Sequence, residues 1–150
     1  PTDAIQNALY KLVLNNRSQI IKIQNTEYIL DAYNANPTSM LSALLAFDNK
    51  KSLNKVVILG DMLELGEYSL KEHDYILNRS LRLSFEKIIT IGTQFYTTTK
   101  EDDRILKFES LQSFKKTLNH SNWKYNHVLI KGSRALQLED LIPFFETLVI

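Results

Sequence analysis

The segment from Asp31 to Pro37, with the sequence DAYNANP, places a carboxylate, a phenol and two amides next to one another. A carboxylate can accept hydrogen bonds from ribose hydroxyls, and an amide can read the edge of a base. Asp and Asn also form turns and helix caps. The spacing alone favours a capping role for Asn36 and leaves Asp31 open between the two roles.

A second segment, Lys131-Gly132-Ser133-Arg134, is the best candidate for an anion site. We expect a helix to follow it, and the N-terminus of a helix favours negative charge. Arg134 could hold a carboxylate or phosphate with two parallel hydrogen bonds. In the alternative reading, Ser133 only caps the helix and both cations are solvated.

Other polar residues give weaker signals. Asp61 and Glu64 could form a carboxylate pair, although such loops are more often merely polar. His73 is expected on a helix, facing either the core or a cleft. None of the three histidines, His73, His120 and His127, has zinc-ligand spacing.

Three apolar runs indicate the elements that position these residues. Residues 56–59, 88–91 and 128–130 are typical of buried strands, and helical patterns separate them. Alternation of this kind predicts an α/β fold with a mostly parallel sheet covered on both faces. Residues 20–23 and 28–30 flank a turn, which predicts an antiparallel hairpin at one edge.

The positions of the glycines indicate which edge of the sheet binds a ligand. Gly60, Gly92 and Gly132 each follow one of the apolar runs, where open parallel sheets bind ligands. Tight strand-to-helix turns would explain the same glycines. The expected edge is lined by Asp61, Thr93 and residues 131–134.

Helix starts are predicted from capping residues. Asn36 should cap a helix beginning at Pro37, and Ser110 should cap another. Residues 69–72 form a capping-box pattern. The last helix contains Pro143, so it either kinks or starts late.

Size and composition exclude several classes of function and of binding site. The 150 residues suit one domain, and a net charge of +1 with dispersed basic residues argues against a nucleic-acid partner. The absence of cysteine excludes thiol catalysis and Cys-ligated metal, and no apolar run approaches a membrane span. There is no P-loop motif and no G-x-G-x-x-G motif. We expect a cytoplasmic protein without a signal peptide, and the missing initiator Met suggests a fragment.

Four motifs together resemble the C-terminal domain of the Mur ligases. They are NNRS (15–18), ILDAYNANPTSM (29–40), VVILGDMLELGEYS (56–69) and VLIKGSRALQLE (128–139). The resemblance is closest to the branch that adds D-alanyl-D-alanine to UDP-N-acetylmuramoyl-tripeptide in peptidoglycan synthesis.

The resemblance implies a Rossmann-like, three-layer domain over residues 15–150, with residues 1–14 as a linker or the last helix of a missing central domain. It implies that the N-terminal domain binds the UDP-sugar peptide. The central domain would supply the P-loop and Mg²⁺, and the C-terminal domain would close over ATP and the amine. This domain alone would hold no cofactor and show no activity.

The resemblance also implies roles for individual residues, with no metal ligand and no assigned catalytic residue in this domain. Those expected near ATP are Arg17, Asp31, Tyr33, Asn34 and Asn36, with Asp31 on the ribose. Those expected near the amine substrate are Lys131, Ser133, Arg134, Asp61 and His73.

Three alternatives remain. A sibling Mur or folylpolyglutamate ligase would share the fold, but DAYNANP and KGSRA argue against it. A receiver-like switch would need an acidic pair after the first strand, and none follows Ile23. A stand-alone ligand-binding module is the third.

Overall fold

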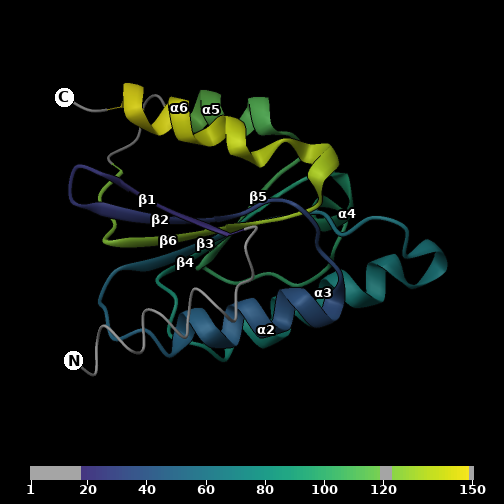
Figure 1. The fold of residues 1–150 in the computed structure, drawn as a ribbon. Coiled ribbons are helices and arrows are strands. Elements are labelled where there is room, and N and C mark those ends of the chain that lie inside the picture. The colour runs from purple at the N-terminus through teal and green to yellow at the C-terminus, as the bar shows by residue number, and fades with distance from the viewer. Residues whose placement is uncertain (1–17, 119–122, 149–150) are drawn as a thin grey trace.

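The computed structural model of the chain describes residues 18–118 and 123–148. Within them, a six-stranded sheet has the order β1-β2-β6-β3-β4-β5, and only the β1–β2 pair is antiparallel. Helices cover both faces of the sheet (Figure 1). The three-layer α/β fold with an antiparallel edge hairpin is therefore confirmed. The expected first helix and the boundary after residue 14 lie outside the described residues.

The strands are β1 (Gln19–Ile23), β2 (Thr26–Asp31), β3 (Lys55–Gly60), β4 (Lys87–Ile91), β5 (Ile105–Phe108) and β6 (His127–Lys131). The helices are α2 (Pro37–Asp48), α3 (Ser69–Leu81), α4 (Thr93–Tyr96), α5 (Leu111–Leu118) and α6 (Leu141–Thr147). Short 3₁₀ turns cover Gly66–Tyr68, Arg134–Leu136 and Leu138–Asp140.

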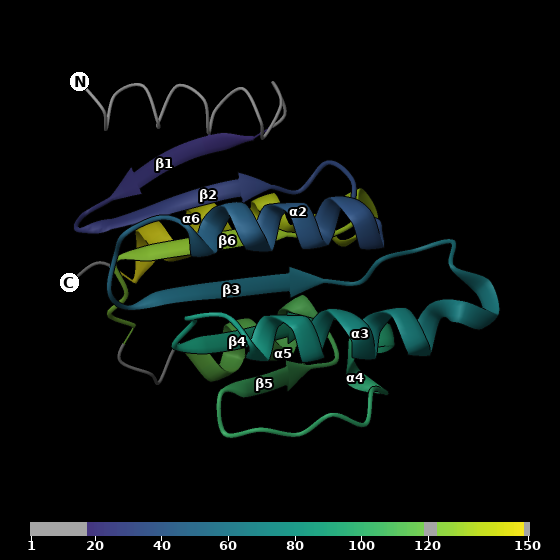
Figure 2. The same ribbon diagram turned by 90° about the horizontal axis from the view of Figure 1, so that it is seen from below.

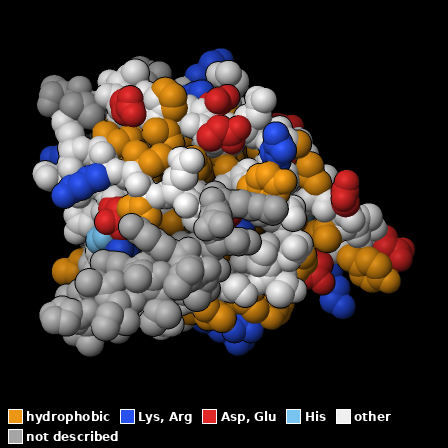
Figure 3. All heavy atoms as spheres, in the orientation of Figure 1, with side chains coloured by type: hydrophobic (Ala, Val, Ile, Leu, Met, Phe, Trp, Pro, Cys, Tyr) orange, Lys and Arg blue, Asp and Glu red, His pale blue; other side chains and the backbone are white. Residues whose placement is uncertain are grey.

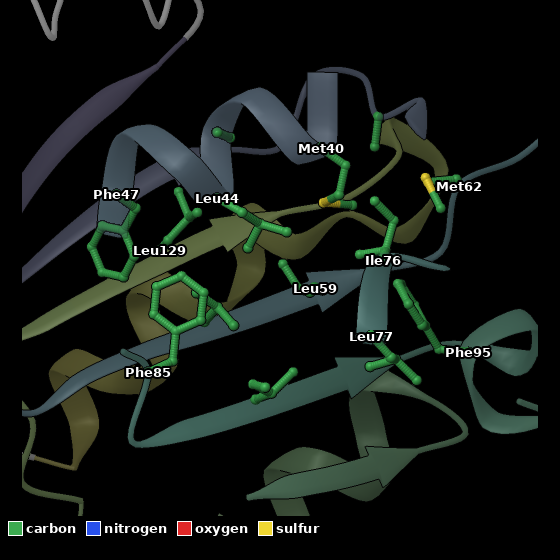
Figure 4. Close-up of a cluster of buried hydrophobic side chains, with 14 of the residues drawn as sticks. Met40, Leu44, Phe47, Leu59, Met62, Ile76, Leu77, Phe85, Phe95 and Leu129 are labelled. Carbon is green, nitrogen blue, oxygen red and sulfur yellow. The ribbon is translucent and has the colours of Figure 1, made fainter. Parts of the chain in front are cut away.

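Two hydrophobic clusters, one on each face, hold the layers together. Val57 and Leu59 of β3 pack in the cluster under α2 and α3, whereas Val56 and Ile58 belong to the cluster under α5 and α6. All four side chains are fully buried, which explains why the strand is continuously apolar. Figure 4 shows the first cluster, with Met40, Leu44, Phe47, Leu59, Met62, Ile76, Leu77, Phe85, Phe95 and Leu129 labelled.

Two predicted helix caps are confirmed. The Asn36 side chain accepts a hydrogen bond from the Ser39 N–H at 2.8 Å, and Pro37 opens α2, where its missing N–H costs nothing. Ser110 accepts from the Ser113 N–H at 3.1 Å at the start of α5.

The capping box predicted at residues 69–72 is wrong. A 3₁₀ turn runs directly into α3, so Ser69 is already helical and Tyr68 occupies the cap position without a side-chain hydrogen bond. The Ser69 hydroxyl instead donates to the Gln94 side chain at 2.6 Å. The last helix starts late, at Leu141, and Pro143 lies in its first turn, where N–H groups have no intrahelical partner.

The five parallel strands point in the same direction, so their carboxyl ends lie along one edge (Figure 2). The loops that follow β2, β3, β4 and β6 all leave from this edge, and they carry nearly all the residues singled out for chemistry.

Candidate functional site

A buried ion pair joins the two segments expected to do chemistry. Lys131 Nζ lies 2.8 Å from Asp31 Oδ2, and the two residues end adjacent strands in matching register. Asp31 is 8% exposed and Lys131 is 3% exposed. Lys131 Nζ also donates to the Asn34 carbonyl at 3.1 Å. The loop after β2 and the loop after β6 are thus held together at their base.

Exposed side chains form a rim beside this pair. The Arg134 guanidinium carbon lies 5.5 Å from the centroid of the Tyr33 ring, a cation–π contact worth about 0.5–1 kcal/mol at an exposed site. Tyr33, Asn34 and Asn36 are also exposed, although the Asn36 side chain is used in the helix cap. Residues from both segments therefore face solvent at one place on the carboxyl edge.

Ser133 is buried at the inner side of the β6 loop. Its N–H donates to the Asp61 carbonyl at 3.1 Å. Within the described residues its hydroxyl has no hydrogen-bond partner, which is uncommon for a buried polar atom.

The α-helix expected after residues 131–134 is not there. A three-residue 3₁₀ turn follows Ser133, and Gln137 then takes a left-handed conformation with φ of 54°. Two short 3₁₀ turns, on either side of Gln137, therefore precede α6. The structure therefore offers no α-helix N-terminus at this loop for the predicted anion site.

Asp61 ties the β3 loop to the β4 loop. Its two carboxylate oxygens accept the N–H groups of Gln94 and Phe95, each at 2.9 Å, at the start of α4. Asp61 is buried, whereas Glu64 is exposed. Gln94 had no sequence signal beyond its place near a strand end, yet it also accepts the Ser69 hydroxyl.

The glycines after the strands are explained by close packing. A Cβ on Gly132 would lie 2.7 Å from Gly60 Cα, and one on Gly92 would lie 2.3 Å from the Asp61 carboxylate. Gly92 also has a φ of 126°, which side chains rarely adopt. These contacts support the tight-turn alternative for the three glycines and bring the loops of β3, β4 and β6 close together.

His73 lies in the core. Its Nε2 accepts the Met62 N–H at 3.0 Å, so the ring is neutral with its proton on Nδ1, which donates to the Ser69 carbonyl at 2.7 Å. The ring edge packs on Phe95 with 4.5 Å between centroids. Burial lowers the pKa of His73 below its ordinary value of 6.5. His73 therefore positions the loop after β3 from inside.

The low pKa of His73 predicts a loss of stability in acid. As pH falls below about 6.5, the unfolded chain binds a proton that folded His73 does not, so the free energy of unfolding decreases. A single group contributes a slope of at most about 1.4 kcal/mol per pH unit. Urea denaturation of wild type and His73→Gln at pH 7 and pH 5 should give a shallower decrease for the variant. If the free energy of unfolding fell equally in both proteins between pH 7 and pH 5, His73 would not be a source of the acid sensitivity. Some slope should remain, because burial also lowers the pKa of His127.

Arg17, the remaining predicted ATP contact, lies outside the described residues. In residues 18–118 and 123–148, no group of three or more His, Asp or Glu side chains could hold a metal ion. No helix in these ranges is long and apolar enough to span a membrane.

Comparison with known proteins gives a consistent set of likenesses. The family model described as "Mur ligase, glutamate ligase domain" matches residues 16–134. The chain is 32% identical over 136 residues to the UDP-N-acetylmuramoyl-tripeptide–D-alanyl-D-alanine ligase of Rickettsia prowazekii, and 32% over 133 residues to that of Treponema pallidum. These alignments cover 87% and 85% of this chain but only 30% and 29% of those proteins.

Among solved structures, a crystal structure of MurF from Acinetobacter baumannii matches with a TM-score of 0.74 and 26% identity. That match covers 89% of this chain and 30% of the other. The chain therefore spans about 30% of the length of the relatives that it matches.

Proposed function

The chain belongs to the Mur ligase family, and from that premise we propose that it is the C-terminal part of an ATP-dependent ligase of peptidoglycan synthesis. The proposed reaction joins D-alanyl-D-alanine to UDP-N-acetylmuramoyl-tripeptide, the activity named for the relatives in Rickettsia and Treponema. The observation that carries the proposal is the meeting of Asp31 and Lys131 at 2.8 Å, which brings the two ligand segments to one edge.

The proposed chemistry has two steps. ATP transfers its terminal phosphoryl group to the carboxylate of the tripeptide and leaves as ADP. The amine of D-alanyl-D-alanine then attacks the carbonyl carbon of the acyl phosphate, and the tetrahedral intermediate expels phosphate and loses the amine proton to give the amide. Asp31 accepts a hydrogen bond from the ribose, with Tyr33 and Asn34 beside the nucleotide. Arg134 holds the carboxylate of the dipeptide with two hydrogen bonds. The role of this domain is to align the amine with the acyl phosphate and to exclude water.

The other components belong to the rest of the polypeptide in this proposal. The sequence has no P-loop, so the triphosphate would be held by a preceding domain. Mg²⁺ would be bound there too, where it neutralises phosphate charge. Asp61 and His73 act indirectly, because their buried polar atoms already hold the loops after β3 and β4.

Exposed apolar side chains support docking against another domain. Leu63, Tyr68, Leu70 and Tyr96 are 41–61% exposed, and all follow strands at the carboxyl edge. Figure 3 shows hydrophobic side chains among charged ones on the projecting segment between β3 and α3. Contact with another domain at this edge would remove these apolar side chains from water. We propose that the N-terminal and central domains of the same polypeptide cover it, in the cytoplasm.

Phosphate release by the full-length protein tests the proposal. Release should require ATP, UDP-N-acetylmuramoyl-tripeptide and D-alanyl-D-alanine together, and omission of any one should abolish it. The 150-residue chain alone serves as the control and should release no phosphate. Turnover by this chain alone, or release by the full-length protein without the dipeptide, would contradict the proposal.

A further inference from the structure

We propose that Lys131 is a positioning residue of the nucleotide site, and that it does not contact the amine substrate. This inference rests on the proposed function and revises the role expected for Lys131 from the sequence. It assigns to one buried side chain the task of holding both the ribose-binding carboxylate and the loop that carries it.

The hydrogen-bonding capacity of the Asp31 carboxylate is the first argument. Lys131 Nζ donates to Oδ2, and among residues 18–118 and 123–148 no other side chain or backbone group bonds to this carboxylate. A carboxylate has two acceptor oxygens, so Oδ1 remains for a ribose hydroxyl. The lysine fixes the direction in which Asp31 presents that oxygen.

Burial of Lys131 is the second argument. The residue is 3% exposed, and its ammonium group already donates to the Asp31 carboxylate and to the Asn34 carbonyl. To reach a substrate, the ammonium group would have to leave Asp31 as an uncompensated buried charge, which is strongly unfavourable. Arg134 is exposed on the same loop and is far better placed for a substrate carboxylate.

The bond to the Asn34 carbonyl is the third argument. It ties the middle of the β2–α2 loop to the end of β6, while the Asn36 cap ties the end of the loop to α2. Tyr33 and Asn34 are thereby held on the rim. Lys131 therefore orders the whole nucleotide-facing loop, in addition to pairing with Asp31.

A double-mutant cycle in the full-length enzyme tests the proposal. Lys131→Met should weaken ATP binding about 10-fold, while the KM for D-alanyl-D-alanine changes less than about 2-fold. If Lys131 acts mainly through Asp31, adding Lys131→Met to Asp31→Asn should weaken ATP binding much less than Lys131→Met does in the wild type, and the bond to the Asn34 carbonyl accounts for the remainder. The double variant also removes both buried charges, so it should fold even if Lys131→Met alone does not.

Lys55→Met provides the matched control. Lys55 is also a buried lysine, but it donates to the carbonyls of Asp48 and Lys50 at the opposite end of the sheet. Its loss should lower the melting temperature without changing ATP affinity, which separates general destabilisation from positioning.

The possible outcomes distinguish this proposal from the proposed function. If Lys131→Met raises the KM for the dipeptide and its effect adds fully to that of Asp31→Asn, Lys131 contacts the substrate and the positioning role is wrong. If Asp31→Asn weakens ATP binding but Lys131→Met does not, only the positioning role fails. If Asp31→Asn leaves ATP affinity unchanged, the nucleotide site of the proposed function itself fails.

Discussion

Asp31→Ala in the full-length enzyme is expected to raise the KM for ATP about 10- to 100-fold, with a much smaller change in the KM for D-alanyl-D-alanine. The substitution removes the oxygen proposed for the ribose, and hydrogen bonds to a charged group contribute about 1.5–3 kcal/mol. It also leaves Lys131 buried without its carboxylate partner, which disturbs the loop further. Initial rates over a range of ATP concentrations, at saturating dipeptide, measure the effect.

Loss of stability must be separated from loss of binding in that experiment. Thermal unfolding of Asp31→Ala, compared with that of Lys55→Met, shows how much of the effect is general destabilisation. A KM for ATP within a factor of about 2 of wild type, in a folded variant, would remove Asp31 from the nucleotide site.

Arg134→Ala is expected to have the opposite selectivity. It should raise the KM for D-alanyl-D-alanine about 10- to 100-fold, because two charge-assisted hydrogen bonds to the carboxylate are lost. ATP binding should change little, since the cation–π contact between Arg134 and Tyr33 is exposed and weak. Rates at saturating ATP over a range of dipeptide concentrations provide the measurement.

Tyr33→Leu is the matched control for Arg134→Ala. It removes the ring on which the guanidinium rests but keeps the cation. A KM for the dipeptide close to that of wild type is expected. If Arg134→Ala raised the KM for ATP and the KM for the dipeptide equally, Arg134 would stabilise both loops together. The assignment of Asp31 to ATP and of Arg134 to the dipeptide would then be wrong.

The fold could be predicted from the sequence because each of its signals is local. The apolar runs at residues 56–59, 88–91 and 128–130 predict buried strands, and the residues that follow Asn36 and Ser110 predict that these two cap helices; the structure has both features. The predicted helix starts are wrong only where a 3₁₀ turn changes the local conformation. The turn before residue 69 continues directly into α3, so Ser69 is not a cap. The turn after residue 133 takes the place of the predicted α-helix.

The site could be predicted only in part, because its contacts depend on which strands become neighbours. Nothing in the spacing shows that β6 lies beside β2, so the pairing of Lys131 with Asp31 could not be foreseen. The same holds for Asp61 and His73, whose polar atoms are used by the neighbouring segments. The sequence suggested polar residues at one edge, and the structure shows which of them face solvent.

The strand order has a consequence for synthesis of the protein. β6 is the last strand of the described chain, yet it lies between β2 and β3. Until the ribosome has released it, both of those strands have an unpaired edge, and such edges invite association with other chains. The sheet is therefore completed only after β6 has left the ribosome, although the strands on both sides of it are synthesised much earlier.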